Sequence, residues 1–488
     1  MNLENLYPER VFHHFLEISK IPRGSGNEKA ISDYLVDFAK KHNLYVYQDE
    51  SNNILIRKEA SKGYEKYKAI ALQGHMDMVC DKNKNVEFDF EKEAIKVKVE
   101  DGFIKADGTT LGADNGICVA MVMSILESDE IKHPKLEILL TTDEEVSMSG
   151  AENFDITKLE SDILVNIDSE QYGSIYVSSA GCSAVASTLE LNSEDILLKD
   201  NIYTIEIKGL QGGHSGGDIH ENRANANKIL ADLISKISVM FDTNIIDFNG
   251  GAKNNTIPRE AMATLVINGE FNEINDLLQL SLDGLNFAFK ETEKGMSAIL
   301  EKVDYANQKQ LNETNTERLL RYILTHPTSV VRKSTEIENL IQTSLNLGIL
   351  ETREKENTKE FYFNSLVRSS KAKEQRYIVD YVLKYAEKYG AKGEILDFCN
   401  PWEYKKDSPI RDYFAKVFEE QNGYKPEILA IHAGLECGIF SEHNPNLDII
   451  SIGPDIKNPH TPDERMSIEA VANTWEYLLK ILEGYKID

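Results

Sequence analysis

The chain has 488 residues, more than a single hydrophobic core usually serves, so we expect two domains. Its 41% hydrophobic and 28% charged residues are typical of a soluble globular protein. The formal net charge of -27 argues against nucleic acids and anionic membranes as partners, because another polyanion would be repelled.

Five cysteines are dispersed along the chain without a C-x-x-C pair: Cys80, Cys118, Cys182, Cys399 and Cys437. An odd, scattered set is typical of reduced thiols in a cytosolic protein. Residues 1–20 contain glutamates and histidines where a secretion signal needs a continuous apolar segment. The longest largely apolar run, 117–126, is about half as long as a membrane span. These features predict a cytoplasmic protein.

The first part of the chain alternates between predicted helices and strands. In order, these are helices over 8–18 and around 31–38, a hairpin over 44–56, a strand over 68–72, a hairpin over 96–105, a buried helix over 115–126, and strands over 136–140 and 163–167. Such alternation indicates an α/β layer architecture. In these sheets, functional groups gather at the carboxyl ends of strands.

The pattern changes near Ser187. The predicted elements there are a strand over 204–207, a glycine-rich loop over 209–217, helices over 222–237, 273–282 and 373–388, and strands over 263–267 and 361–363. A β-loop-α-β order recurs within this stretch, so two related halves are one interpretation. We predict an inserted α+β domain over residues 187–399.

After Pro401 the α/β pattern resumes. A helix over 411–421 and strands over 428–431 and 447–452 precede a last helix, for which Ser467 is a good N-cap. The apolar stripe of that helix indicates a packed face. Residues 400–488 are therefore predicted to complete the domain that residues 1–186 begin.

A histidine and an aspartate follow the predicted strand at 68–72. In an extended segment, residues i and i+2 point to the same side. His75 could therefore bind a metal while Asp77 holds the other ring nitrogen, as metal-bound histidines require. The alternative is a surface histidine near an aspartate, because H-x-D alone is a weak signal.

Asp114 stands at the start of a predicted helix, where a carboxylate could bridge two cations or serve as an ordinary N-cap. Glu144 and Glu145 follow a strand, and such a pair is costly unless a positive charge lies beside it. One could bind metal while the other takes a proton from a metal-bound water. The alternative for the pair is a solvated acidic turn.

Two further candidates complete this set. Asp168 follows the strand at 163–167, and a strand cap is its alternative interpretation. His460 lies in a loop bracketed by prolines, where an exposed histidine is the alternative. Two histidines with several carboxylates suit zinc or, less selectively, manganese or cobalt.

The glycine-rich loop contains Gly213-His214-Ser215-Gly216-Gly217. It is not a phosphate-binding P-loop, because no Gly-Lys-Ser/Thr follows. It does fit the G-x-S-x-G pattern of a serine nucleophile, but that arrangement needs a helix immediately after the serine. Helical periodicity resumes only near Asn222. His214 could also be a solvated loop histidine.

The chain resembles the M20 metallopeptidases and, within them, the aminoacyl-histidine dipeptidase (Xaa-His dipeptidase, peptidase D) group. The family resemblance rests on Gly74-His75-Met76-Asp77, Leu111-Gly112-Ala113-Asp114-Asn115-Gly116, Thr142-Asp143-Glu144-Glu145, Asn166-Ile167-Asp168 and Pro459-His460-Thr461. The group resemblance rests on Gly212-Gly213-His214-Ser215-Gly216-Gly217-Asp218-Ile219-His220, Arg223-Ala224-Asn225 and His432-Ala433-Gly434-Leu435-Glu436-Cys437-Gly438.

This resemblance implies an α/β, di-zinc exopeptidase-like catalytic domain with a mixed sheet and flanking helices, interrupted by an α+β lid. It also implies the metal ligands. Asp114 would bridge two zinc ions. His75 and Asp168 would complete the ligand set of one metal. Glu145 and His460 would complete the set of the other.

The remaining roles also follow from the resemblance. Glu144 would be the general base, and Asp77 would orient His75. His214, from the lid, would stabilise the oxyanion or bind substrate. Arg368 is a weaker candidate for binding the substrate carboxylate, with a surface arginine as its alternative, and Asn255 is weaker still.

The implied activity is hydrolysis of dipeptides, either aminoacyl-histidine or broader, by a zinc-activated water and a glutamate base. The role of Glu436 is open, and a homodimer is one alternative for the oligomeric state. Two rival functions are a serine hydrolase using Ser215 and a non-catalytic metal-binding protein. An unligated Glu144 argues against the latter, since binding alone does not need it.

Overall fold

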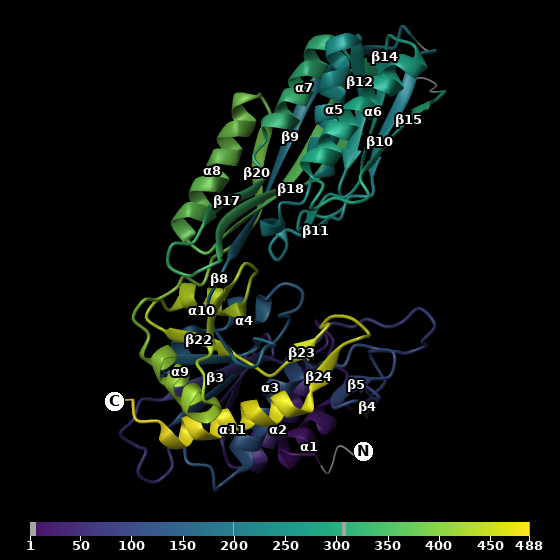
Figure 1. Cartoon of the computed structure of the whole chain (residues 1–488). Helices are drawn as coiled ribbons and strands as arrows, with labels where there is room; N and C mark the ends of the chain where they lie inside the picture. The colour runs from purple at the N-terminus through teal and green to yellow at the C-terminus, as the bar shows by residue number, and fades with distance from the viewer. Residues whose placement is uncertain (1–5, 199, 305–308, 488) are drawn as a thin grey trace. The chain divides into compact units, whose positions relative to one another are not determined.

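The computed structural model describes residues 6–198, 200–304 and 309–487. The chain forms two compact units, which Figure 1 colours by residue number. Unit 1 comprises Met1–Ser179, Trp402–Ala430 and Leu435–Asp488, and unit 2 comprises Ala180–Pro401 and Ile431–Gly434. The purple N-terminal and yellow C-terminal segments thus belong to the same unit.

A mixed sheet forms the centre of unit 1. Its strands, in spatial order, are β1 (Tyr45–Gln48), β2 (Ile54–Lys58), β6 (Leu136–Thr141), β3 (Ile70–His75), β7 (Ile163–Ile167), β22 (Asp448–Ile452), β8 (Ser174–Ser179) and β21 (Glu427–Ile431). The four central strands β6, β3, β7 and β22 run parallel. Strands β3, β6 and β7 are buried along their whole length, as parallel strands covered on both faces should be.

Helices surround this sheet: α1 (Glu9–Ile18), α2 (Lys29–Lys41), α3 (Ala113–Glu127), α4 (Ser149–Asn153), α9 (Pro409–Asn422), α10 (Glu436–His443) and α11 (Ile468–Gly484). The predicted buried helix is confirmed, because every residue of α3 from Ala113 to Leu126 is buried. The N-cap expected at Ser467 is also confirmed, since its side chain accepts a hydrogen bond from the backbone N–H of Ala470.

A smaller sheet in unit 1 carries the loop around His460. It contains β23 (Ile456–Lys457), β24 (Arg465–Ser467), β5 (Phe103–Ala106) and β4 (Val97–Glu100), in that order. The predicted hairpin between β4 and β5 is confirmed, with Asp101 and Gly102 both at positive φ, as a tight hairpin turn requires. Strands β23 and β24 hold the two ends of the loop that contains His460.

Unit 2 is built on one large antiparallel sheet. Its strands are β15 (Ser297–Lys302), β10 (Ile202–Lys208), β14 (Ala261–Ile267), β12 (Thr243–Gly250), β18 (Ile341–Glu354), β19 (Thr358–Ser369), β9 (Gly181–Asp195) and β16 (Lys309–Leu311), with β17 (Ser329–Lys333) on β18 and β20 (Lys392–Cys399) on β9. Its helices are α5 (Ala226–Met240), α6 (Phe271–Ala288), α7 (Glu313–Thr325) and α8 (Ala372–Lys388). The apolar sides of α5, α6 and α7 contribute to its main core.

Two details differ from the sequence-based expectations. The boundary expected at residue 187 lies inside β9, whose partners β19 and β20 belong to unit 2. The helix expected from Asn222 begins at Ala226, because Asn222 is left-handed and the Asn225 side chain caps the helix. No helix within residues 6–198, 200–304 and 309–487 is long and apolar enough to cross a bilayer.

Candidate metal centre

Three neighbouring parallel strands deliver the candidate residues to one edge of the unit 1 sheet. His75 is the last residue of β3, and Asp168 directly follows β7. Glu144 and Glu145 lie in the turn after β6. Because β6, β3 and β7 are adjacent and parallel, their carboxyl ends meet, as expected for a functional site in such a sheet.

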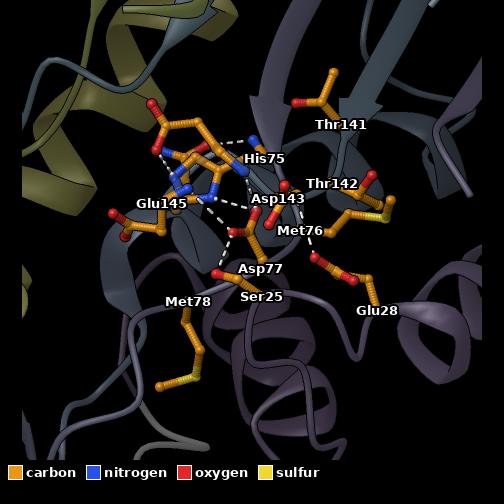
Figure 2. Close-up of polar contacts among 12 residues, drawn as sticks. Ser25, Glu28, His75, Met76, Asp77, Met78, Thr141, Thr142, Asp143 and Glu145 are labelled. Atoms are coloured by element: carbon orange, nitrogen blue, oxygen red, sulfur yellow. Dashed lines mark hydrogen bonds and ion pairs between the residues drawn. The ribbon is translucent and has the colours of Figure 1, made fainter. Parts of the chain in front are cut away.

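Asp77 holds His75 in place and organises the turn beside it (Figure 2). One carboxylate oxygen lies 3.2 Å from His75 Nδ1, and the other accepts a hydrogen bond from Ser25 Oγ at 2.7 Å. The backbone N–H groups of Glu144 and Glu145 donate to the same carboxylate at 3.1 and 3.2 Å. Although burial alone would raise it, these hydrogen bonds lower the pKa of Asp77 to about 2. Asp77 is therefore a fixed anion that engages His75 Nδ1, so that Nε2 is the ring nitrogen available to a metal.

Asp114 lies between the two candidate histidines. Its Oδ1 is 3.1 Å from His75 Nε2, and its Oδ2 is 3.0 Å from His460 Nε2. Gly112, just before α3, adopts φ of 68°, and the peptide bond between Asp114 and Asn115 is cis. Because each Asp114 oxygen faces a different histidine, the carboxylate can bridge two cations.

The neighbouring donors fit two metal ions. His75, Asp114 and Glu145 have ligand atoms within 4.8 Å of one another, and so do Asp114, Glu170 and His460. Glu145 Oε2 is also 3.0 Å from His460 Nε2. Asp168 Oδ1 is 3.8 Å from His75 Nε2. Nitrogen and carboxylate donors in this mixture suit zinc and similar divalent ions.

Two buried oxygens in this cluster support the same interpretation. Glu145 Oε1 and Asp168 Oδ1 have no hydrogen-bond partner among the described residues. A buried carboxylate oxygen without a partner is costly, and a bound cation would satisfy it. The residues present therefore fit a two-metal site.

The charge balance of the cluster is strongly negative. Contacts with Asp114 and Glu145 raise the pKa of His460 to about 11. Burial raises the pKa of Asp168 well above its usual range, and burial together with Asp114 raises the pKa of Glu170 to about 9. The same negative potential that favours protons on these groups favours a bound cation in their place.

Glu144 differs from its neighbours. Its Oε2 is 3.9 Å from His75 Nε2, and it belongs to neither metal-compatible group found among the described residues. Burial raises the pKa of Glu144 to about 8, and the charges of Glu436, Glu145 and Asp114 contribute in the same direction. A carboxylate with such a pKa can both accept and return a proton near neutral pH.

Glu464 supports the segment that carries Asp114. This role of Glu464 was not predicted from the sequence. Its buried carboxylate accepts hydrogen bonds from the four consecutive backbone N–H groups of residues 111–114, at 2.6 to 3.3 Å. These include the first N–H groups of α3, which lack partners within the helix. Because Glu464 is in the His460 loop, a single side chain links the two segments.

Arg23 supports the same region through a second set of hydrogen bonds. Its Nη1 donates to the carbonyl oxygens of Met76 and Asp77, both at 2.9 Å, and its Nη2 donates to the carbonyl oxygen of Gly112. Arg23 is buried, and these bonds replace part of the hydration that its guanidinium loses. It therefore ties the His75 segment to the Asp114 segment.

Glu436 lies in a buried polar chain beneath the site. It accepts hydrogen bonds from Gln73 Nε2 at 2.6 Å and Thr141 Oγ1 at 2.9 Å. Gln73 Oε1 in turn accepts from Asn166 Nδ2 at 2.7 Å. Burial raises the pKa of Glu436 to about 7. The chain connects β6, β3 and β7 just before their carboxyl ends.

The other three predicted site residues gather in unit 2. Arg368 in β19 is buried, and its Nε donates to Ser215 Oγ at 3.4 Å. Its Nη2 lies 3.4 Å from His214 Nε2. The Ser215 N–H donates to the carbonyl oxygen of Asn255 at 2.8 Å, where β11 (Gly213–His214) pairs with β13 (Thr256–Ile257). Burial and the Arg368 charge lower the pKa of His214.

The geometry around Ser215 does not favour a serine nucleophile. His214 Nδ1 accepts hydrogen bonds from the backbone N–H groups of Gly216 and Gly217 at 3.3 and 3.0 Å, so this nitrogen is engaged. A turn and a short 3-10 helix (Ile219–Glu221) follow Ser215 before α5 begins. The strand-to-helix turn of a nucleophile elbow is therefore missing here.

Sequence reasoning missed three residues in unit 1. Glu170 stands two positions after Asp168, and that spacing was a usable signal. Glu464 stands four positions after His460 in the same loop, but nothing in the local pattern marks it as buried. Arg23, in the Pro-Arg-Gly stretch after the first helix, gave no pattern that distinguishes it from a surface arginine.

The amino-acid sequence matches peptidase family M20/M25/M40 over residues 71–484. It is 36% identical over 483 residues to the cytosol non-specific dipeptidase of Escherichia coli (strain K12), covering 99% of this chain and 98% of that protein. The structure matches the aminoacylhistidine dipeptidase of Vibrio alginolyticus with a TM-score of 0.91 and 35% identity, covering 100% and 99% of the two chains. A Staphylococcus aureus tripeptidase, at 16% identity, shares the fold with a TM-score of 0.58 and 98% coverage of both chains. The chain therefore belongs to peptidase family M20/M25/M40 and is a peptide hydrolase.

Proposed function

We propose that this peptide hydrolase is a metal-dependent dipeptidase that uses two zinc ions. The observation that carries the proposal is the position of Asp114, whose two oxygens face His75 and His460 separately. The dipeptide specificity is supported by the names of two full-length relatives, one a non-specific dipeptidase and the other an aminoacylhistidine dipeptidase.

The proposed ligand sets share Asp114 as the bridge. His75 and Asp168 complete the first set, and His75 Nε2 lies 3.8 Å from Asp168 Oδ1. Glu145 and His460 complete the second set, and Glu145 Oε2 lies 3.0 Å from His460 Nε2. Zinc is our first choice because the set mixes histidine and carboxylate donors, with manganese or cobalt as alternatives.

We assign different catalytic roles to the metal ions, Glu144 and Asp77. When bound, the two metal ions would polarise the scissile carbonyl and acidify the attacking water. Glu144 accepts the proton of that water and returns it to the nitrogen of the leaving amine. Its Oε2 lies 3.9 Å from His75 Nε2, so the carboxylate is close to the site without being a proposed ligand. Asp77 keeps the His75 ring in one orientation while charge shifts during the reaction.

Unit 2 is proposed to recognise the substrate, in the role of the lid domain expected from the sequence. A guanidinium binds a carboxylate strongly, so Arg368 is assigned to the carboxylate end of the dipeptide. His214 is assigned to the carbonyl oxygen that becomes negative during hydrolysis. Asn255 is assigned a weaker polar contact with the substrate. The three lie together around Ser215.

We also place the protein in the cytosol. The Escherichia coli relative, which matches nearly the whole chain, is named a cytosolic enzyme. The five cysteines are free thiols, as expected in a reducing compartment. Fractionation of the native cells followed by immunodetection would test this assignment.

Chelation and reconstitution test the proposed activity. The purified chain is stripped with a chelator, reloaded with zinc, manganese or cobalt, and assayed on Xaa-His dipeptides, other dipeptides and a tripeptide. We expect chelation to abolish hydrolysis, a metal to restore it, and dipeptides to be preferred. Full activity after complete metal removal, or labelling of Ser215 by a fluorophosphonate with loss of activity, would contradict the proposal.

A further inference from the structure

One row of side chains crosses four strands of unit 2. In the register of β18, β19, β9 and β20, Ser344 is opposite Arg368, Arg368 is opposite Cys182, and Cys182 is opposite Cys399. Directly opposed residues of neighbouring antiparallel strands point to the same face. The two cysteines therefore continue the row that contains Arg368.

The two thiols are placed for a disulfide without being joined by one. Both are free and partly accessible to solvent. Opposed residues of an antiparallel pair have Cβ atoms about 4.5–5.5 Å apart. A disulfide needs roughly 3.5–4.5 Å, so a small adjustment of the two strands would suffice.

The surroundings of the pair make its two thiols different. A hydrogen bond with Cys399 lowers the pKa of Cys182 to about 7, against the effects of burial and of Asp397, and Arg368 contributes in the lowering direction. The same contact and burial raise the pKa of Cys399. Burial raises the pKa of Cys80, the exposed cysteine of unit 1. A thiolate beside a positive charge is the form that reacts with oxidants.

We infer that Cys182 and Cys399 form a peroxide-sensitive thiol pair. The Cys182 thiolate attacks one oxygen of a hydroperoxide, forming an S–O bond as the O–O bond breaks and hydroxide leaves. Cys399 sulfur then attacks the Cys182 sulfenic acid, forming the S–S bond as the S–O bond breaks. The Cys399 proton leaves with the oxygen as water. The two thiols together lose two electrons, which reduce the peroxide.

Cys182 and Cys399 lie near the two ends of the main segment of unit 2, so a disulfide between them would have a structural consequence. Cys182 is the second residue of β9, and Cys399 is the last residue of β20. Unit 2 begins at Ala180 and its main segment ends at Pro401, so the pair lies where the chain enters and leaves the unit. A disulfide would join these two crossing points covalently and remove the thiolate beside Arg368.

Peptide mapping of the intact chain tests the inference directly. The protein is treated with graded hydrogen peroxide, alkylated and digested without reduction. We expect a linked peptide containing Cys182 and Cys399 at peroxide concentrations that leave Cys80 reduced. At pH 7, Cys182 should react with iodoacetamide roughly tenfold faster than Cys80. The absence of the linked peptide, or equal alkylation of the two cysteines, would overturn the inference.

Three variants sharpen the experiment. Cys399→Ser should leave a Cys182 sulfenic acid that dimedone traps, whereas Cys182→Ser should abolish the peroxide reaction at both positions. Cys80→Ser is the matched control and should form the linked peptide as the parent does. These readouts require no peptidase activity. A change in KM after oxidation, with kcat little changed, is expected only if Arg368 also binds substrate, and that part rests on the proposed function.

Discussion

The Glu464 carboxylate accepts a hydrogen bond from the backbone N–H of Asp114, the residue that lies between His75 and His460 in the candidate metal centre. Three further bonds from residues 111–113 hold the preceding backbone to the same carboxylate. Because Glu464 and His460 share a loop, the positions of Asp114, the proposed bridging ligand, and of His460, a proposed terminal ligand, depend on one buried side chain. The loop therefore links His460 to the backbone that carries Asp114.

Replacing Glu464 by glutamine should weaken metal binding. The amide keeps one acceptor oxygen but turns an NH2 group toward backbone N–H donors, leaving buried groups without partners. We expect metal affinity to fall by about 10- to 100-fold, as for other groups that support metal ligands. Metal titration of the stripped protein would measure this. Asp463→Asn, at the neighbouring position, is the control and should keep the parental affinity.

Glu144→Gln should separate catalysis from metal binding. The amide cannot accept the water proton, so kcat should fall by about 10²- to 10⁴-fold. The number of bound metal ions should not change, because Glu144 is not a proposed ligand. Glu152→Gln, on α4 nearby, serves as the control with near-parental kcat. Retention of full activity in Glu144→Gln would show that another group is the base.

Asp168→Asn and Glu170→Gln decide which carboxylate is a ligand. Asp168 is assigned to the first metal because its Oδ1 faces His75, whereas Glu170 groups with Asp114 and His460. We expect Asp168→Asn to lose one tightly bound ion and Glu170→Gln to keep both, as measured by elemental analysis after dialysis. The reverse pattern would transfer the ligand role to Glu170.

Gly74→Ala and Gly284→Ala should have opposite effects on stability. A Cβ at Gly74 would overlap with Asn115 Oδ1 and Cys118 Sγ in the buried core beside the site. We expect a loss of about 1–3 kcal/mol, as for other overpacked positions. Gly284 lies exposed within α6, and a Cβ there meets nothing within 4 Å, so alanine should stabilise by about 0.5–1 kcal/mol. Chemical denaturation would measure both free energies of unfolding.

Unit 2 should lose stability as the pH falls below neutrality. Burial, aided by the charge of Lys228, lowers the pKa of His326 to about 3. Its Nδ1 lies 2.9 Å from the carbonyl oxygen of Pro327. Below the usual histidine pKa, the unfolded chain binds a proton that the folded chain excludes, so acid favours unfolding.

Proton linkage sets an upper limit on how steeply the free energy of unfolding can change with pH. The free energy of unfolding should fall by up to about 1.4 kcal/mol per pH unit between roughly pH 6.5 and 3. Urea denaturation at several pH values would measure the slope. His326→Gln, which keeps a donor for the Pro327 carbonyl, should have a shallower slope. An unchanged slope in this variant would show that other groups control the acid sensitivity.

Much of unit 1 was predictable because its signals are local. Short apolar runs marked β3, β6 and β7, and the residues after them marked the carboxyl ends where the candidate ligands gather. The short helix α10 was missed because it contains Gly438 and spans only Glu436–His443. Glu464 was missed because its importance depends on backbone donors far away in the sequence, which local periodicity does not reveal.

Unit 2 was harder to predict for a physical reason. Its long strands β9, β18 and β19 mix buried and exposed positions, and their pairing joins distant parts of the chain. The row from Ser344 through Arg368 to Cys399 exists only once that register is set. The scattered cysteines of the sequence gave no indication that two of them are neighbours.

The strand order of unit 1 has a consequence for biosynthesis. Strand β22, from the late part of the chain, lies between β7 and β8, which are made much earlier. While the ribosome is still translating unit 2, these two strands have no neighbour in the gap between them, and His460 has not yet been made. Under the proposed ligand assignment, the metal site therefore stays incomplete until this last segment has been made.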